Sequence, residues 1–400
     1  MKKTLLFVAA MLMTATMAKA SDVESAEVDI ATTQTNEISE FQDVNTDQAF
    51  LEQHKPFMAP PPEERPHGEV GYWAQKVASR LKVTGYAQAG YNATLNEGAN
   101  NSNSFEMRRV ILMVGADIAP HFYAFFMHDF KSGGMQEYYM EYRASKAFNV
   151  RLGQSKKEFS MENPMSPTVL ESIGPMAQGV FWLNGYDPLI SNGSGRDMGL
   201  MFYGDVFKGR LRYVAEVVNG GQINTSDKNN QKNFVGKLEY KFLPNLRIGV
   251  SGEIGHGYAV AASGYNDIAV GETYRQNRWA FSGEWKSKKT GTDYNRHRCA
   301  SVRAEVLGGM DGNVHSFGGY VSSAIPVYKQ LDVVAMVDNY NYNTSKNYLQ
   351  TNLMAGIQLW LHTKCRLQLQ YTYCALSSAH RADLGKTNCS KIDAQVQVAF

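Results

Sequence analysis

The chain has 400 residues and a mass of 44.6 kDa; 44% of its residues are hydrophobic, 20% are charged, and its formal net charge is +2. Four cysteines are too few for a disulfide-stapled scaffold, and the small net charge gives no sign of nucleic-acid binding. Beyond the N-terminus no apolar run approaches the roughly 18 residues that a spanning helix needs, which excludes a helical membrane protein. A soluble enzyme and a transmembrane β-barrel both remain compatible with these values.

The first twenty residues have the order of a secretory signal peptide. Lys2 and Lys3 precede an apolar stretch over 5–13, and Ala18-Lys19-Ala20 supplies the small residues for cleavage near Ala20. A short buried helix is the alternative interpretation. The pattern predicts that residues 1–20 are removed and that the mature chain leaves the cytoplasm.

Residues 21–70 are expected to form a mobile acidic extension in the periplasm. Residues 21–55 carry nine acidic side chains against Lys55 alone, and Pro60-Pro61-Pro62 follows shortly after. Such a segment cannot bury enough apolar area to offset the entropy lost on ordering. A short helix that docks on a partner is the alternative. The remaining 330 residues hold 35 basic and 26 acidic side chains, a net charge of +9.

From residue 81 onward, apolar residues recur at every second position. Over 391–400, for example, Ile, Ala, Val, Val and Phe alternate with Lys, Asp, Gln and Gln. A period of two places the two sets on opposite faces of a β-strand. The polar face is too charged for the interior of a sandwich, and the apolar face is too regular for a solvent surface. A barrel that lies in lipid around a wet lumen satisfies both constraints.

Residues 71–400 are therefore predicted to form an all-β, transmembrane antiparallel barrel of about 16 strands. The predicted strands are 81–95, 104–118, 121–131, 136–145, 148–154, 196–204, 210–218, 232–241, 246–255, 277–286, 298–307, 314–325, 330–340, 349–361, 364–376 and 390–400. Even-numbered strands mostly lead into short links and odd-numbered strands into longer ones, as in outer-membrane barrels. The links around 242–245, 256–276 and 287–297 fit this parity poorly.

Two further features favour an outer-membrane barrel. Phe400 ends the last alternating strand in phase with four apolar residues, which resembles the signal that the β-barrel assembly machinery recognises. The link 155–195 is unusually long for a surface connection, so it is predicted to fold inward as a constriction loop.

Several short motifs resemble one family when they are taken in their order along the chain. They are Phe105-Glu106-Met107-Arg108-Arg109, His128-Asp129-Phe130, Tyr138-Tyr139-Met140-Glu141-Tyr142, Val150-Arg151-Leu152-Gly153-Gln154 with Lys156 and Phe159-Ser160, Gly195-Arg196-Asp197-Met198-Gly199, and Asn219-Gly220-Gly221. This order resembles the phosphate-selective porin O and P family, most densely between residues 81 and 255.

The resemblance implies a sixteen-stranded, trimeric porin. The chain departs from the family pattern at three places: Ile111 stands where a further basic residue often follows the paired arginines, Glu158 replaces a proline, and Ser172 replaces an arginine. Selectivity for phosphate is therefore left open.

Basic and acidic side chains are nearly equal in number on the predicted lumen wall, so most of the +9 excess is expected in turns, loops and rims. Pore selectivity needs charges of one sign at a narrow place. The candidates for an anion path are basic residues on the wall and at the base of the loop, namely Arg109, Arg143, Arg151, Lys156, Lys157 and Arg196.

The loop also holds the aromatic residues Phe181, Trp182 and Tyr186. Folded into the lumen, they can narrow the pore, and the rings of Trp182 and Tyr186 can stack on a sugar. The alternative is that Phe181 and Trp182 pack against the barrel wall or a neighbouring subunit.

No motif predicts an enzyme, a metal site or a cofactor. The nine histidines show no metal-ligand spacing, and nothing selects a nucleophile and its base. Cys374 and Cys389 flank the last long link at lumen-phase positions, so a disulfide between them is conceivable; four free thiols are the alternative.

The sequence thus predicts an outer-membrane porin of a Gram-negative bacterium that passes small hydrophilic solutes, with anions such as phosphate among them. Its expected partners are outer-membrane lipid, the assembly machinery and two further copies of the chain in a homotrimer. A structural or adhesive barrel, which binds partners through its N-terminal extension and outer loops, is the alternative.

Overall fold

The computed structural model describes residues 75–76, 78–174, 176–186, 189, 194–287, 299–328, 330–362 and 364–400. The predicted signal peptide over 1–20 and the predicted acidic extension over 21–70 lie outside the described residues. Within the described part of the chain, no helix is long and apolar enough to cross a bilayer.

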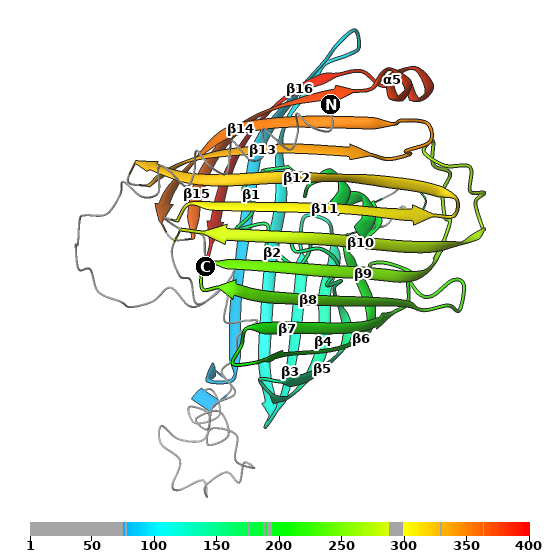
Figure 1. Ribbon diagram of the computed structural model, residues 1–400. Coiled ribbons are helices and arrows are strands. Elements are labelled where there is room, and N and C mark those ends of the chain that lie inside the picture. Colours follow the sequence, from blue (N-terminus) through cyan, green and yellow to red (C-terminus); the bar gives the residue numbers. More distant parts are fainter. Residues whose placement is uncertain are drawn as a thin grey trace, which may run out of the picture.

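The described residues form a closed barrel of sixteen antiparallel strands, in which each strand pairs with its neighbours in sequence and β1 pairs with β16 (Figure 1). This confirms the predicted fold. The strands are β1 (Leu81–Asn96), β2 (Ser102–Ala119), β3 (Phe122–Asp129), β4 (Gly134–Ser145), β5 (Phe148–Lys156), β6 (Arg196–Val206), β7 (Leu211–Val218), β8 (Asn233–Leu243), β9 (Leu246–Tyr258), β10 (Thr273–Lys286), β11 (Ser301–Asp311), β12 (Val314–Tyr328), β13 (Leu331–Asn341), β14 (Leu349–His362), β15 (Cys365–Leu376) and β16 (Cys389–Ala399).

The alternation of side chains along each strand separates an apolar outer face from a polar inner face. In β16, Val396 and Val398 are 48% and 52% exposed on the outside, whereas Gln395 and Gln397 between them are 4% and 2% exposed inside. The inner glutamines are hydrogen-bonded to side chains of β15 and β1, such as Gln88 at 2.9 Å from Gln397. Closure of the barrel therefore satisfies polar groups that an open sheet would leave at its edge.

The two ends of the barrel differ in the length of their connections. At one end, here called the turn rim, even-numbered strands lead into the next strand by short turns; at the other, the loop rim, most links are longer. The links after β8 and β9 follow this rule, since the first is short and the second is long. In the sequence pattern both had fitted the alternation of short and long links poorly. The connection after β10 is the exception, because β10 ends at Lys286 at the turn rim and β11 begins only at Ser301.

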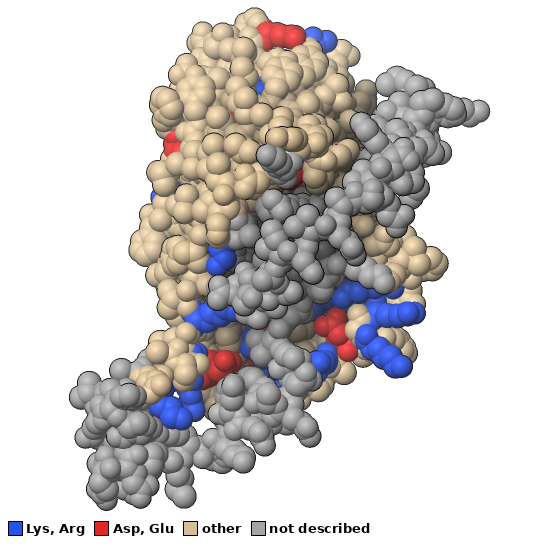
Figure 2. Space-filling view, turned by 90° about the vertical axis from the view of Figure 1, so that its left-hand side faces the viewer, with Lys and Arg blue, Asp and Glu red and all other residues tan. Residues whose placement is uncertain are grey.

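Basic side chains gather at the turn rim. Figure 2 faces this end, and lysine and arginine side chains are prominent around its lower part. The turns after β4 and β6 carry the exposed side chains Lys146, Lys208 and Arg210, and the end of β8 carries the exposed Lys241. The surplus of positive charge thus lies partly outside the lumen, as the sequence indicated.

Cys374 and Cys389 are direct partners in the register of β15 and β16, as the predicted bridge requires. All four cysteines are nevertheless free thiols in this structure, Cys374 and Cys299 buried and Cys365 and Cys389 half-buried. The disulfide therefore stays a prediction, supported by the register alone.

Candidate functional site at the pore constriction

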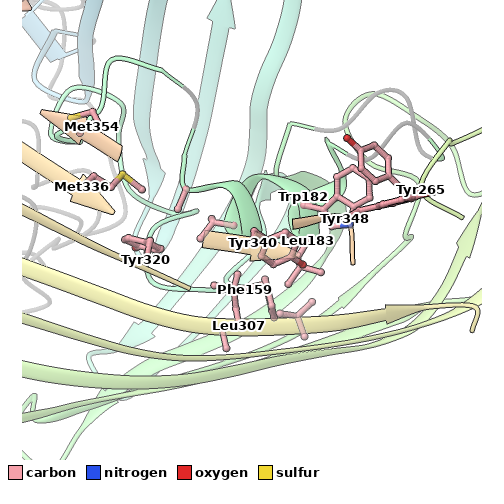
Figure 3. Packing of buried hydrophobic residues seen from close by; sticks show 14 of the residues in the cluster. Phe159, Trp182, Leu183, Tyr265, Leu307, Tyr320, Met336, Tyr340, Tyr348 and Met354 are labelled. Carbon is pink, nitrogen blue, oxygen red and sulfur yellow. The ribbon is translucent and has the colours of Figure 1, made fainter. Parts of the chain in front are cut away.

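The chain between β5 and β6 folds into the barrel instead of covering its rim. It contains α4 (Gln178–Phe181) followed by a wider helical turn, η2 (Trp182–Tyr186). Phe159 and Leu183 of this loop pack against Leu307 and Tyr340 of the wall (Figure 3). All four side chains are 0% exposed, so the apolar residues of the loop form a core with the inner face of β11 to β13.

Wall carboxylates hold the backbone of the loop. Glu305 accepts hydrogen bonds from the backbone N–H groups of Met161 and Glu162, at 2.9 and 3.0 Å. Asp338 accepts one from the N–H group of Gln178 at 2.8 Å. The loop therefore covers these two carboxylates, and its backbone N–H groups occupy them as hydrogen-bond donors.

Three ion pairs also fasten the loop to the wall. Lys157 donates to Glu253 at 2.9 Å, and both side chains are fully buried. Arg303 of β11 forms an ion pair with Glu171 of the loop at 2.5 Å. Glu158 of the loop pairs with Lys237 of β8 at 2.9 Å. Burial acts to raise the pKa of the Glu158 carboxyl group, but the positive charge of Lys237 holds that pKa below its usual range. These contacts fix the loop against the wall formed by β8 to β13.

The two ends of the loop are joined at its base. The side-chain amide of Asn163 donates to the carbonyl oxygens of Lys157 and Gly195, at 2.7 and 2.9 Å. Gly195 has a φ of 68°, and a Cβ atom there would lie 2.1 Å from the Asn163 side-chain oxygen. Glycine is thus required where the chain leaves the loop and enters β6.

The path through the barrel runs between the loop and the wall formed by β1 to β6. Two cavities lie along it: a loop-side cavity of about 350 Å³ and a turn-side cavity of about 120 Å³, which Phe400 borders near the turn rim. Five residues line both cavities and define the constriction: Tyr86, Met127, Lys156, Pro167 and Arg196.

The constriction carries a surplus of positive charge. Arg196 forms an ion pair with Glu137 at 3.1 Å. Lys156 donates to the carbonyl oxygen of Met165 and, among the described residues, has no acidic partner. Arg109 borders the loop-side cavity and donates to the side chain of Gln88 at 3.0 Å. Two cations without a carboxylate partner therefore lie at or beside the narrow part of the path.

Tyr186 of the loop lies close to the same cations. Burial raises the pKa of its phenol, while the positive charges of Arg196 and Arg109 act to lower it. Tyr186 stacks on Phe181 with ring centroids 3.8 Å apart, and both rings line the loop-side cavity. Trp182 instead packs edge-on against Tyr265 and Tyr342, at 4.9 and 4.8 Å, and belongs to the packing core.

The remaining predicted cations lie in three different environments. Arg151 lines the turn-side cavity and pairs with Glu141 at 2.8 Å. Arg143 pairs with the same carboxylate at 2.5 Å and does not border either cavity. Lys157 was expected beside the path, but it is turned into the wall and pairs with Glu253, because its backbone position already belongs to the inward loop.

Two lining features were missed by the sequence analysis. The register passes from Gln88↔Arg109 to Ala89↔Met107, so a β-bulge turns Arg108 inward beside Arg109, where it donates to the carbonyl oxygen of Ile173 at 3.0 Å. Tyr86, which the sequence analysis did not place on the path, is 4% exposed inside the lumen. The adjacent pair of arginines was the one available signal for the bulge.

The comparisons with known proteins support the barrel fold but do not identify a family. No family model matches the chain, and no curated protein matches it either. The resemblance to the phosphate-selective porin family therefore stands without such support.

Solved structures match nearly the whole barrel. An anion-selective porin from Comamonas acidovorans is 14% identical, with a TM-score of 0.56 over 80% of this chain and 99% of that one. OprB of Pseudomonas putida is 10% identical, with a TM-score of 0.61 over 83% and 97%. OmpT of Vibrio cholerae in a trimer form is 10% identical, with a TM-score of 0.54 over 80% and 100%. The chain thus has a porin-like barrel fold.

Proposed function

We propose that the chain is an outer-membrane porin: a water-filled channel for passive diffusion of small hydrophilic solutes, with a preference for anions. The oily outer face, the wet inner face and the inward loop support a channel. The predicted signal peptide supports export, and the structural likeness to porins supports an outer-membrane location.

The observation that carries the anion preference is Lys156, which has no acidic partner among the described residues and lines the cavities on both sides of the constriction. A charge acts most strongly where the path is narrow and walled by low-dielectric protein. The wall opposite uses its carboxylates to hold the loop, so it contributes little negative charge to the path.

The test is a reversal-potential measurement on the purified protein in a planar lipid bilayer with a gradient of potassium chloride. The expected sign is that of a chloride-selective channel. A cation-selective reversal potential would refute the anion preference while leaving a channel in place. An electrically silent barrel would favour the structural or adhesive alternative.

Phosphate is the finer candidate among the anions. Arg109 borders the loop-side cavity, so millimolar phosphate is expected to reduce the chloride current, and Arg109→Ala to relieve that block. Ile111, at the position where the family often has a further basic residue, lies in the same cavity wall. A chloride current that is unchanged by phosphate would limit the proposal to anions in general.

We extend the proposal to assembly. A homotrimer is supported by the trimer form of OmpT, whose barrel this chain resembles. Phe400 is 61% exposed, and its backbone N–H group donates to the carbonyl oxygen of Gly85 at 2.9 Å across the β1–β16 seam. Its place at the end of the closing strand fits a role as the signal for the assembly machinery.

A further inference from the structure

Part of the lumen wall is apolar, which is unusual for the inside of a water-filled barrel. Inward-facing side chains of β1 to β4 form what is here called the aromatic strip: Tyr86, Met113, Phe125, Met127 and Tyr139. Phe125 stacks on Tyr139 with ring centroids 5.1 Å apart. The strip occupies lumen positions at which the neighbouring strands place charged or amide side chains.

The inward loop does not cover this strip. The strip lines the turn-side cavity, and the loop faces it across that cavity with Pro164, Pro167 and Val169. Apolar surface therefore borders the cavity from both sides. Because such surface favours contact with apolar solutes over contact with water, the cavity can retain a solute that has an apolar body.

Cationic groups border the same cavity, and the two carboxylates that also line it, Glu137 and Glu158, are paired with Arg196 and Lys237. The guanidinium carbon of Arg151 lies 4.0 Å from the centroid of the Tyr139 ring, and the guanidinium group pairs with Glu141 at 2.8 Å. Lys156 lies at the constriction end of the cavity, where, within the described part of the chain, it donates to the carbonyl oxygen of Met165 and to no carboxylate. An apolar surface thus lies next to one uncompensated ammonium group.

We infer that the turn-side cavity is a binding site for small aromatic carboxylates. The ring would pack between the aromatic strip and the loop prolines, and the carboxylate would pair with the ammonium group of Lys156. An inorganic anion uses only the charge, and a neutral ring uses only the apolar surface, so each binds more weakly than a molecule that has both. This inference rests on the proposed channel function and narrows its solute class.

The experiment measures block of the chloride current in planar bilayers by sodium benzoate. Sodium acetate, which carries the carboxylate without the ring, and benzyl alcohol, which carries the ring without the charge, are the comparison solutes. Benzoate is expected to block at a concentration about tenfold lower than acetate, the difference expected for burying a small apolar group. Equal block by benzoate and acetate, in a barrel that conducts, would overturn the inference but not the channel.

Adjacent residues of β3 provide matched variants. Phe125 points into the lumen and is 8% exposed, whereas Phe126 points outward and is 36% exposed. Phe125→Ala is expected to weaken benzoate block about tenfold with little change in acetate block, and Phe126→Ala to leave both unchanged. Equal effects of the two substitutions on benzoate block would contradict the assignment to the strip.

A second variant tests the charged half of the site and does not depend on the strip. Lys156→Gln is expected to remove most of the difference between benzoate and benzyl alcohol while the barrel keeps its far-ultraviolet circular dichroism. Undiminished benzoate block in this variant would refute the pairing with Lys156, even if Phe125→Ala failed to fold.

Discussion

Replacing Lys156 by glutamate is expected to reverse the ion preference of the channel. The substitution changes the charge at the constriction by two units, at a side chain that lines the cavities on both sides of it. At effective dielectric constants of 20 to 80, a pair of unit charges 4 Å apart interacts by about 1 to 4 kcal/mol, so the chloride-to-potassium permeability ratio should fall at least about tenfold.

The reversal potential in a potassium chloride gradient measures this change directly. Lys232→Glu is the matched control, because Lys232 lies in the link between β7 and β8 and pairs with Asp227 away from the constriction. The control should leave the ratio close to its original value. If Lys156→Glu and the control moved the reversal potential equally, the selectivity would come from the overall charge of the protein.

Replacing the next residue, Lys157, by glutamine is expected to destabilise the folded barrel with little effect on selectivity. Its ammonium group is fully buried against Glu253, and removing one member of a buried ion pair leaves the other without compensation. Arg278 remains 3.5 Å from the same carboxylate, which places the expected cost at the low end of such losses, about 3 kcal/mol.

Urea unfolding in detergent micelles, followed by tryptophan fluorescence, measures the loss of stability. The double variant Lys157→Gln with Glu253→Gln should recover much of it, since the carboxylate left without its lysine is then gone and Arg278 keeps its ion pair with Asp311 at 3.3 Å. The adjacent lysines thus predict a crossed result: Lys156→Gln shifts the reversal potential more than the stability, and Lys157→Gln does the opposite. Similar shifts of the reversal potential in both variants would contradict the buried position of Lys157.

The contrast between these two lysines shows where sequence reasoning ended. Both were predicted beside the anion path because they stand at the base of the inward loop, just after the predicted strand 148–154. Lys156 is the last residue of β5 and is paired with Arg196 in the register of β5 and β6. Both side chains line the path, although strict alternation from Arg151 would direct Lys156 to the other face. Lys157 belongs to the loop, whose backbone direction is set by contacts with β9 and β11 that lie about a hundred residues away along the chain.

The charges show the same division. Counted by face, basic and acidic side chains on the lumen wall are nearly balanced, which predicted little selectivity. The structure distributes them unequally, because the loop occupies the wall that contains Glu253, Glu305 and Asp338. What a solute meets is the opposite wall, where Lys156 and Arg109 have no carboxylate partner among the described residues.

The sequence by itself determined the barrel, its strand number and, for most positions, which side chains face outward. The alternation of apolar and polar residues is a local property of each strand, and it directs apolar side chains to lipid and polar side chains to the lumen. It also placed the long link that enters the lumen. The bulge at Arg108, the inward Tyr86 and the apolar strip beneath the constriction were decided only by the tertiary structure. They depend on the register between strands and on what the loop covers, and both are set by long-range contacts.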